Sequence, residues 1–122
     1  MQTQAVEKIK PAANFMATDQ NEQNFSLSDF KGKVVVLHIT QLKNPLCLEC
    51  ESSIVGELKE IKKLADRDDP GIVVVTLNLR KAPDSEPGWA LAQKDYGINI
   101  TWRWVEEFDP YPIGKDYLDT GR

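Results

Sequence analysis

Cys47 and Cys50 are the only cysteines among the 122 residues, and Leu48 and Glu49 separate them. A C-x-x-C pair between an apolar run and an amphipathic segment predicts a thiol–disulfide redox site. Only a thiolate attacks a disulfide, and a helix N-terminus lowers the pKa of a thiol placed there. We therefore expect Cys47 to attack a substrate disulfide, and Cys50, beneath it on the same helix face, to resolve the mixed disulfide.

Glu49, His38 and Pro45 are candidate modulators of this pair. The carboxylate of Glu49 should raise the pKa of the Cys47 thiol, which favours a reductant or a mildly poised exchanger over a strong oxidant. Pro45 lies in the connector that leads into the pair. His38 lies on the preceding strand and could shuttle a proton to or from Cys50, because imidazole titrates near neutral pH. The alternative is a strand histidine that is hydrogen-bonded in or near the core.

Length and composition indicate one domain with a single core over residues 11–122, preceded by a flexible tail over residues 1–10. The net charge of -4 gives no basic surface for nucleic acid, so we expect no nucleic-acid partner. No stretch approaches the roughly 20 apolar residues of a membrane span. The N-terminus lacks the apolar core of a signal peptide, and the residues themselves leave the compartment unknown.

The elements that must position the cysteines follow from the apolar patterns. The run 34–40 is nearly all β-branched or apolar, which is typical of a strand buried on both faces of a mostly parallel sheet. From Cys47, apolar residues recur at helical spacing until Asp66. The order of strands and helices predicts an α/β layer fold. The remaining predicted elements are a hairpin at 15–19 and 24–27, strands at 72–79 and 98–105, a helix at 88–96 ended by Gly97, and a helical turn at 113–118.

The chain resembles the thioredoxin superfamily, most closely its TlpA-like and AhpC/TSA-type redoxin branch. The resemblance is carried by the stretches 13–20 and 25–37, by the cysteine pair, and by 89–98 with Trp102. It implies a three-layer thioredoxin-like fold with a central, mostly parallel sheet and an N-terminal hairpin. It also implies disulfide reduction, exchange or isomerisation in a protein partner by a monomer without a cofactor or metal, and it favours an extracytoplasmic setting.

Three departures from that branch bear on activity. The connector 41–46 is longer than usual and has Leu46 where a tryptophan commonly precedes the first cysteine. Leu48 and Glu49 replace the usual Pro-Pro or Gly-Pro, which should shift redox potential and substrate docking. We also expect the chain to end at about the point where the family has its cis-proline, last hairpin and last helix. Pro112 precedes the position of the cis-proline and is a poor substitute for it, and the missing strands would leave an exposed sheet edge.

Other functions remain open at this point. A thiol peroxidase of the same superfamily would place a hydroxyl three residues before its cysteine, where this chain has Asn44. A metal-binding or copper-chaperone module would want more ligands than two cysteines and His38 supply. A redox-inactive interaction domain is the non-enzymatic alternative. The three tryptophans are expected in the core or half-buried, and the run 106–109 is expected to be a solvated strand end.

Overall fold

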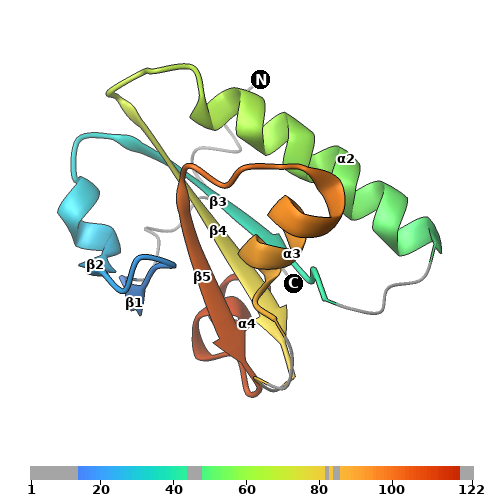
Figure 1. Ribbon diagram of the computed structural model, residues 1–122. Helices are drawn as coiled ribbons and strands as arrows, with labels where there is room; N and C mark the ends of the chain where they lie inside the picture. The colour runs from blue at the N-terminus through green and yellow to red at the C-terminus, as the bar shows by residue number, and fades with distance from the viewer. Residues whose placement is uncertain (1–13, 44–47, 82, 84–85, 119–122) are drawn as a thin grey trace, which may run out of the picture.

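The computed structural model describes residues 14–43, 48–81, 83, 86–118, and its centre is a three-stranded parallel sheet (Figure 1). The strands are β3 (Val34–Thr40), β4 (Ile72–Arg80) and β5 (Arg103–Phe108), in the order β3-β4-β5. β3 and β4 pair in register from Val34↔Ile72 to Thr40↔Asn78. Their β-branched runs favour the extended backbone and bury both faces. Among the described residues, β3 is paired along one edge only.

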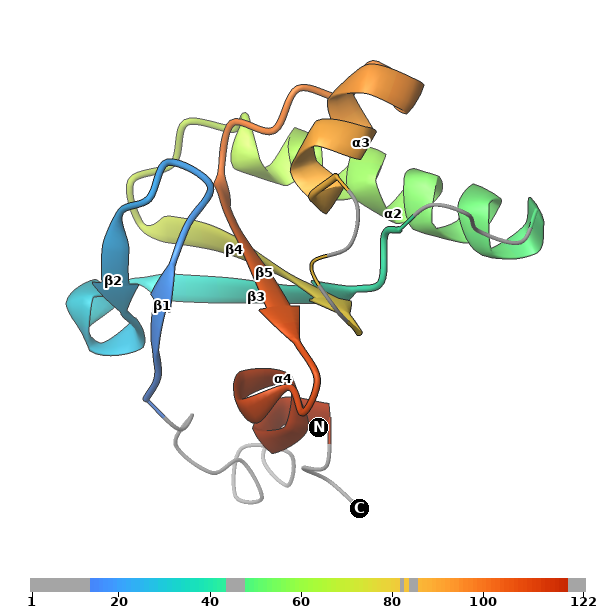
Figure 2. The ribbon, with the colours of Figure 1, turned by 60° about the horizontal axis from the view of Figure 1, so that its bottom comes forward.

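Helices cover both faces of this sheet (Figure 2). On one face lie α2 (Leu48–Ala65) and α3 (Gly88–Tyr96), packed on a core that contains Leu58, Val74 and Trp104. On the other lie the hairpin of β1 (Met16–Thr18) and β2 (Asn24–Ser26), the 3₁₀ turn η1 (Leu27–Phe30) and α4 (Pro112–Leu118). The core of that second face includes Phe25, Val75, Leu77, Leu79 and Val105. The predicted three-layer α/β architecture is therefore confirmed, and the alternating residues of β4 supply both cores.

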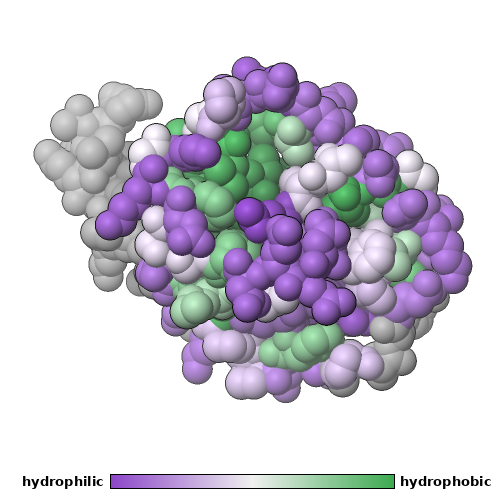
Figure 3. All heavy atoms as spheres, turned by 60° about the vertical axis from the view of Figure 1, so that its left-hand side comes forward, coloured by the Kyte–Doolittle hydropathy of each residue, from purple (hydrophilic) through white to green (hydrophobic). Residues whose placement is uncertain are grey.

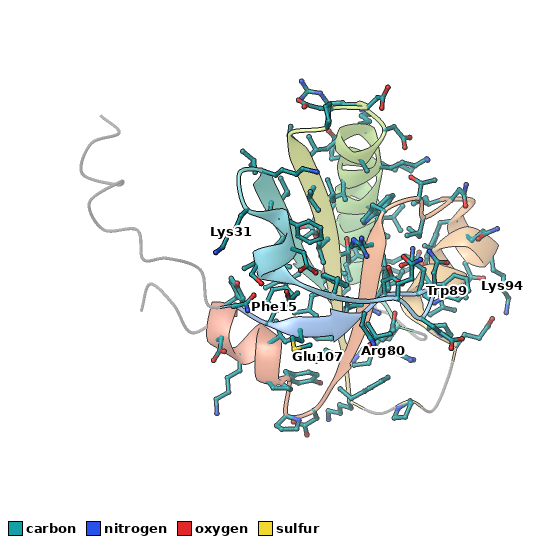
Figure 4. All side chains as sticks on the ribbon, turned by 90° about the vertical axis from the view of Figure 1, so that its left-hand side faces the viewer. Phe15, Lys31, Arg80, Trp89, Lys94 and Glu107 are labelled. Carbon is teal, nitrogen blue, oxygen red and sulfur yellow. The ribbon has the colours of Figure 1, made fainter. Side chains whose placement is uncertain are left out.

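The N-terminal hairpin is fastened to the outer edge of β5 by its turn. The side-chain amide of Gln20 makes the hydrogen bonds that the backbone of a neighbouring strand would make. Its Nε2 donates to the carbonyl of Trp102 at 2.7 Å, and its Oε1 accepts from the N–H of Trp104 at 2.9 Å. Asp19 pairs with Arg103 at 3.0 Å. On the same side of the sheet, the rings of Phe15 and Tyr117 meet edge to face, which places Phe15 beside α4 (Figure 4).

The third strand begins later than its sequence pattern predicts. β5 starts at Arg103 instead of Ile98, because the N–H of Ile98 bonds back to the carbonyl of Ala92, 3.0 Å away, and so completes the C-terminal cap of α3. Gly97 permits that cap at φ 66°, as expected for the residue that ends the helix. No helix among the described residues is long and apolar enough to cross a membrane.

The expected solvated strand end at 106–109 is wrong for its two glutamates. Glu106 and Glu107 belong to β5, and their side chains are largely buried. Glu107 faces α4, where its carboxylate accepts from the N–H groups of Ile113 at 2.8 Å and Gly114 at 2.7 Å. These N–H groups belong to the first turn of the helix and lack partners within it, so the buried charge is compensated. Glu106 faces the opposite side of the sheet.

Candidate redox site

Cys50 is the third residue of α2 and lies on the surface at the carboxyl end of β3. No free cysteine occurs among the described residues, because the sulfur of Cys50 is held in a disulfide. Cys47 and Pro45 lie outside the described residues, so their predicted roles stay predictions. The strand-to-helix setting predicted for the C-x-x-C stretch is observed, since β3 ends at Thr40 and α2 begins at Leu48.

The first turn of α2 presents an exposed surface around Cys50. Leu48 is 84% exposed, and Glu49 is exposed beside it. The carboxylates of Glu49 and Glu51 lie at the positive end of the helix dipole, which favours the start of the helix here. The effect expected of Glu49 on the Cys47 thiol is not tested by these contacts.

Tyr96 ties the end of α3 to the turn that carries Cys50. Its hydroxyl donates to Glu51 Oε2 at 2.7 Å. Burial, followed by the bond to the Glu51 carboxylate, raises the pKa of Tyr96 to about 12. Glu51 directly follows Cys50 in the chain, so this bond restrains the backbone next to the candidate resolving cysteine.

His38 lies on β3 and faces α2 from within the sheet. Its Nδ1 is 3.1 Å from Thr76 Oγ1, which also accepts a hydrogen bond from Trp102 Nε1 at 2.8 Å. Its Nε2 is 3.7 Å from a carboxylate oxygen of Glu57, an ion-pair distance that is too long for a hydrogen bond. Burial lowers the pKa of His38 more than the Glu57 charge raises it. These contacts match the expectation of a hydrogen-bonded strand histidine, and proton shuttling to Cys50 stays a prediction.

Asn78 holds the connector that leads from β3 to the cysteines. Its Oδ1 accepts from the N–H of Leu42 at 2.6 Å, and its Nδ2 donates to the Leu42 carbonyl at 2.9 Å. Both residues are fully buried. A buried backbone N–H or C=O without a partner costs about 1–3 kcal/mol, so a single side chain here satisfies two such groups.

Glu106 is the centre of a buried polar cluster behind Asn78. Its carboxylate accepts from Arg80 Nε at 2.7 Å, from Asn78 Nδ2 at 3.2 Å, from the N–H of Gly88 at 2.7 Å and from Trp104 Nε1. Arg80 is itself buried and also donates to the Glu86 carbonyl at 2.9 Å. The cluster therefore joins β4, β5 and the start of α3, and Asn78 connects it to Leu42.

Gly88 is required where α3 enters this cluster. A Cβ atom at this position would collide with Asn78 Nδ2 and would lie 2.8 Å from the Trp104 ring. The glycine lets the helix backbone approach closely enough for its N–H to reach Glu106. The Glu106 cluster therefore depends on a backbone contact that a larger residue would block.

A separate groove of about 750 Å³ lies at the opposite end of the sheet. Ile72 and Val74, at the start of β4, contribute to its lining together with Arg103 and residues of the hairpin turn. The surface view shows a hollow with apolar atoms at its bottom and polar side chains at its rim (Figure 3). Cys50 does not line this groove. Among the described residues, no group of three or more His, Cys, Asp or Glu side chains could hold a metal ion.

Sequence reasoning found the cysteines and His38 but missed Asn78, Arg80, Glu106 and Tyr96. A signal was present for two of them. Asn78 and Arg80 interrupt a strand that is otherwise apolar apart from Thr76, and polar groups in a buried strand require partners. Their partner, Glu106, belongs to β5, which the sequence pattern places at 98–105 instead of 103–108. The polar cluster could therefore not be predicted from the sequence.

No protein-family model matches this sequence, and no curated protein is detectably similar to it. Solved structures do share its architecture. The thioredoxin domain of a thiol-disulfide oxidoreductase from Bacteroides vulgatus matches with a TM-score of 0.60 at 20% identity, over 92% of this chain and 74% of that chain. A thiol-disulfide oxidoreductase from Bacteroides fragilis matches with a TM-score of 0.63 at 18% identity, over 91% of this chain and 77% of that chain.

A third match carries a different role. BsSco, a member of the Sco family of cytochrome c oxidase assembly proteins, matches with a TM-score of 0.57 at 15% identity, over 88% of this chain and 61% of that chain. The chain is shorter than these proteins and spans as little as 56% of one matched structure, a hypothetical protein from Sinorhizobium meliloti. At such identities the matches establish architecture rather than activity. By its parallel sheet, its two helical layers and these matches, the chain has a thioredoxin-like fold.

Proposed function

We propose that this chain is a thiol–disulfide oxidoreductase that acts on a disulfide of a protein partner through Cys47 and Cys50. The observation that carries the proposal is the position of Cys50, exposed in the first turn of the helix that follows β3 in a thioredoxin-like fold. Its engagement in a disulfide, in a chain with one other cysteine, is consistent with a reversible pair. Several proteins with the same architecture are thiol-disulfide oxidoreductases.

The proposed reaction transfers two electrons. In the reduced chain, the Cys47 thiolate attacks one sulfur of the substrate disulfide, and the other substrate sulfur leaves as a thiolate that takes up a proton. Cys50 then loses its proton and attacks the Cys47 sulfur. This releases the second substrate thiol and leaves a Cys47–Cys50 disulfide, so the substrate is reduced and the chain is oxidised. Leu48 and Glu49, which directly precede Cys50 in the chain, are exposed and leave this turn of α2 open to a protein substrate.

Reduction of insulin disulfides with dithiothreitol as the electron donor tests the proposal. The wild-type chain should accelerate precipitation of the insulin B chain, whereas Cys47→Ser should not, because it lacks the attacking sulfur. Lys59→Ser, a substitution on an exposed position of α2, is the matched control and should retain the wild-type rate. Equal rates for the wild type and Cys47→Ser would reject the proposal.

Glu49→Gln tests the predicted modulation of the pair. Removing the carboxylate between the cysteines should lower the pKa of the Cys47 thiol and make the disulfide a stronger oxidant. The measurement is the thiol–disulfide equilibrium of the pair with glutathione. Glu60→Gln, also exposed on α2 but almost three turns beyond Cys50, is the control and should leave that equilibrium unchanged.

A further inference from the structure

We propose that Asn78 is a positioning residue for the cysteine pair and acts through the backbone of Leu42. The inference rests on the proposed function, because it concerns how the same pair is held. Leu42 lies in the connector between β3 and α2, five positions before Cys47. Asn78 lies on the neighbouring strand, and its two hydrogen bonds fix both polar groups of the Leu42 backbone.

The orientation of the Asn78 amide is imposed by Glu106. A carboxylate only accepts hydrogen bonds, so the Nδ2 group must face it, and Oδ1 is thereby turned toward the N–H of Leu42. One Nδ2 hydrogen serves Glu106 and the other serves the Leu42 carbonyl, 2.9 Å away. The amide therefore has no spare donor, and its one orientation satisfies every group around it.

Glu106 is in turn held by groups from three elements. Arg80 on β4 neutralises its charge at 2.7 Å, Trp104 on β5 donates to it, and the N–H of Gly88 at the start of α3 donates at 2.7 Å. With these partners in place, Glu106 has little freedom to turn away from Asn78. The side chain of Asn78 thus links Leu42, in the connector, to the sheet and to the start of α3.

This anchor matters because the connector joins β3 to the cysteine pair. Leu42 precedes Cys47 by five positions, and a backbone fixed at Leu42 limits where the chain that follows it can lie. A thiolate is stabilised by a helix N-terminus only while it is held there. Loss of the Asn78 anchor should therefore reduce the thiolate character of Cys47 while the cysteines themselves stay unchanged.

The test is the alkylation rate of the Cys47 thiol by iodoacetamide as a function of pH. It uses a Cys50→Ser background, in which Cys47 is the single thiol. Asn78→Ala should slow alkylation at neutral pH by about three- to ten-fold and move the pH profile upward, because the reagent reacts with the thiolate. Asn78→Ser, whose hydroxyl supplies one donor hydrogen in place of the two of the amide, should give an intermediate rate and serves if the alanine variant does not fold.

Glu107→Ala is the matched control. It also removes a buried side chain of the sheet and its hydrogen bonds, but on the opposite face, beneath α4. It should lower the stability yet leave the alkylation profile unchanged. Asn78 variants whose profiles match that of Glu107→Ala, at equal folded fractions, would overturn the inference. Because alkylation needs no turnover, a chain that fails to reduce insulin would refute the proposed function and still decide this one.

Discussion

The side-chain amide of Asn78 and the backbone of Leu42, 36 positions apart in the chain, complete each other's hydrogen bonds at 2.6 and 2.9 Å. Through this pairing, β4 stays hydrogen-bonded to the chain two residues beyond the end of β3 at Thr40. The pairing places the connector to the cysteines under the control of β4 and, through Glu106, of β5 and α3. The connector to the cysteines is thus bound to a buried polar cluster whose members lie far from Cys47 and Cys50 in the sequence.

Gly88→Ala should destabilise the chain by about 1–3 kcal/mol, the usual cost of overpacking a well-filled core. The added methyl group would collide with the Asn78 amide and the Trp104 ring. Gly56→Ala is the control, because Gly56 is exposed within α2 and a Cβ there meets nothing within 4 Å. It should stabilise the helix by about 0.5–1 kcal/mol. Urea unfolding measures both, and a neutral Gly88→Ala would contradict the close approach described above.

Much of this fold could be predicted because single patterns dominate its elements. The strand predicted over 34–40 and the helix predicted over 88–96, ended by Gly97, match β3 and α3 residue for residue. β5 could not be placed in this way. Ile98 is apolar and buried, but its N–H completes the cap of α3, a choice that depends on three-dimensional packing.

The two cysteines and His38 were recognisable because their chemistry is rare among the residue types of this chain. Glu106 was not, since a glutamate beside another glutamate reads as a solvated pair. Its burial depends on four donors brought together by the fold: Arg80, Asn78, Gly88 and Trp104. Sequence reasoning assigns the reactive groups of a site more readily than the groups that hold them.

Thr40→Val should stabilise the chain by about 1 kcal/mol. The Thr40 hydroxyl is buried and finds no hydrogen-bond partner among the residues that the structure describes, and an isosteric methyl group removes that penalty. Thr76→Val is the control, because the Thr76 hydroxyl has partners in His38 and Trp102 and its loss should destabilise. Chemical denaturation compares the two variants. A destabilised Thr40→Val would show that the hydroxyl at the end of β3 has an energetic role.

His38 should make the chain less stable as the pH falls below about 6.5. Burial lowers the pKa of His38 in the folded chain below its ordinary value of 6.5, so the unfolded chain binds the proton more readily. The stability is therefore complete above that pH and is lost as the pH falls from 6.5 toward the folded pKa. His38→Gln should flatten this part of the stability profile.

Glu57→Gln should act on the same profile in the opposite sense. The Glu57 carboxylate raises the pKa of His38, so its removal lowers that pKa further and steepens the acid loss. Urea unfolding between about pH 5 and 8, where an ordinary histidine titrates, supplies the measurement for both variants. Identical slopes in the wild type and His38→Gln would contradict the assignment.

Tyr96 should remain protonated well above the pH at which a free tyrosine ionises. Its pKa is raised to about 12 by burial and by the Glu51 carboxylate that accepts its hydrogen bond. Glu51→Gln should lower that pKa toward the ordinary value of 10.0, because it removes the negative charge. Ultraviolet titration of tyrosinate, with Tyr96→Phe to identify the signal, measures the shift. The stability that this proton contributes is complete below pH 10 and is lost as the pH rises toward 12.

Covalent trapping of a substrate tests the proposed redox pair most directly. A disulfide-bonded peptide is mixed with reduced Cys50→Ser and, separately, with reduced Cys47→Ser, and the adducts are identified by mass spectrometry. Cys50→Ser should accumulate a mixed disulfide through Cys47, because the resolving thiol is missing, whereas Cys47→Ser should remain largely unmodified. Adducts that form equally on both variants, or on neither, would contradict the account of Cys47 as the attacking residue and Cys50 as the resolving one.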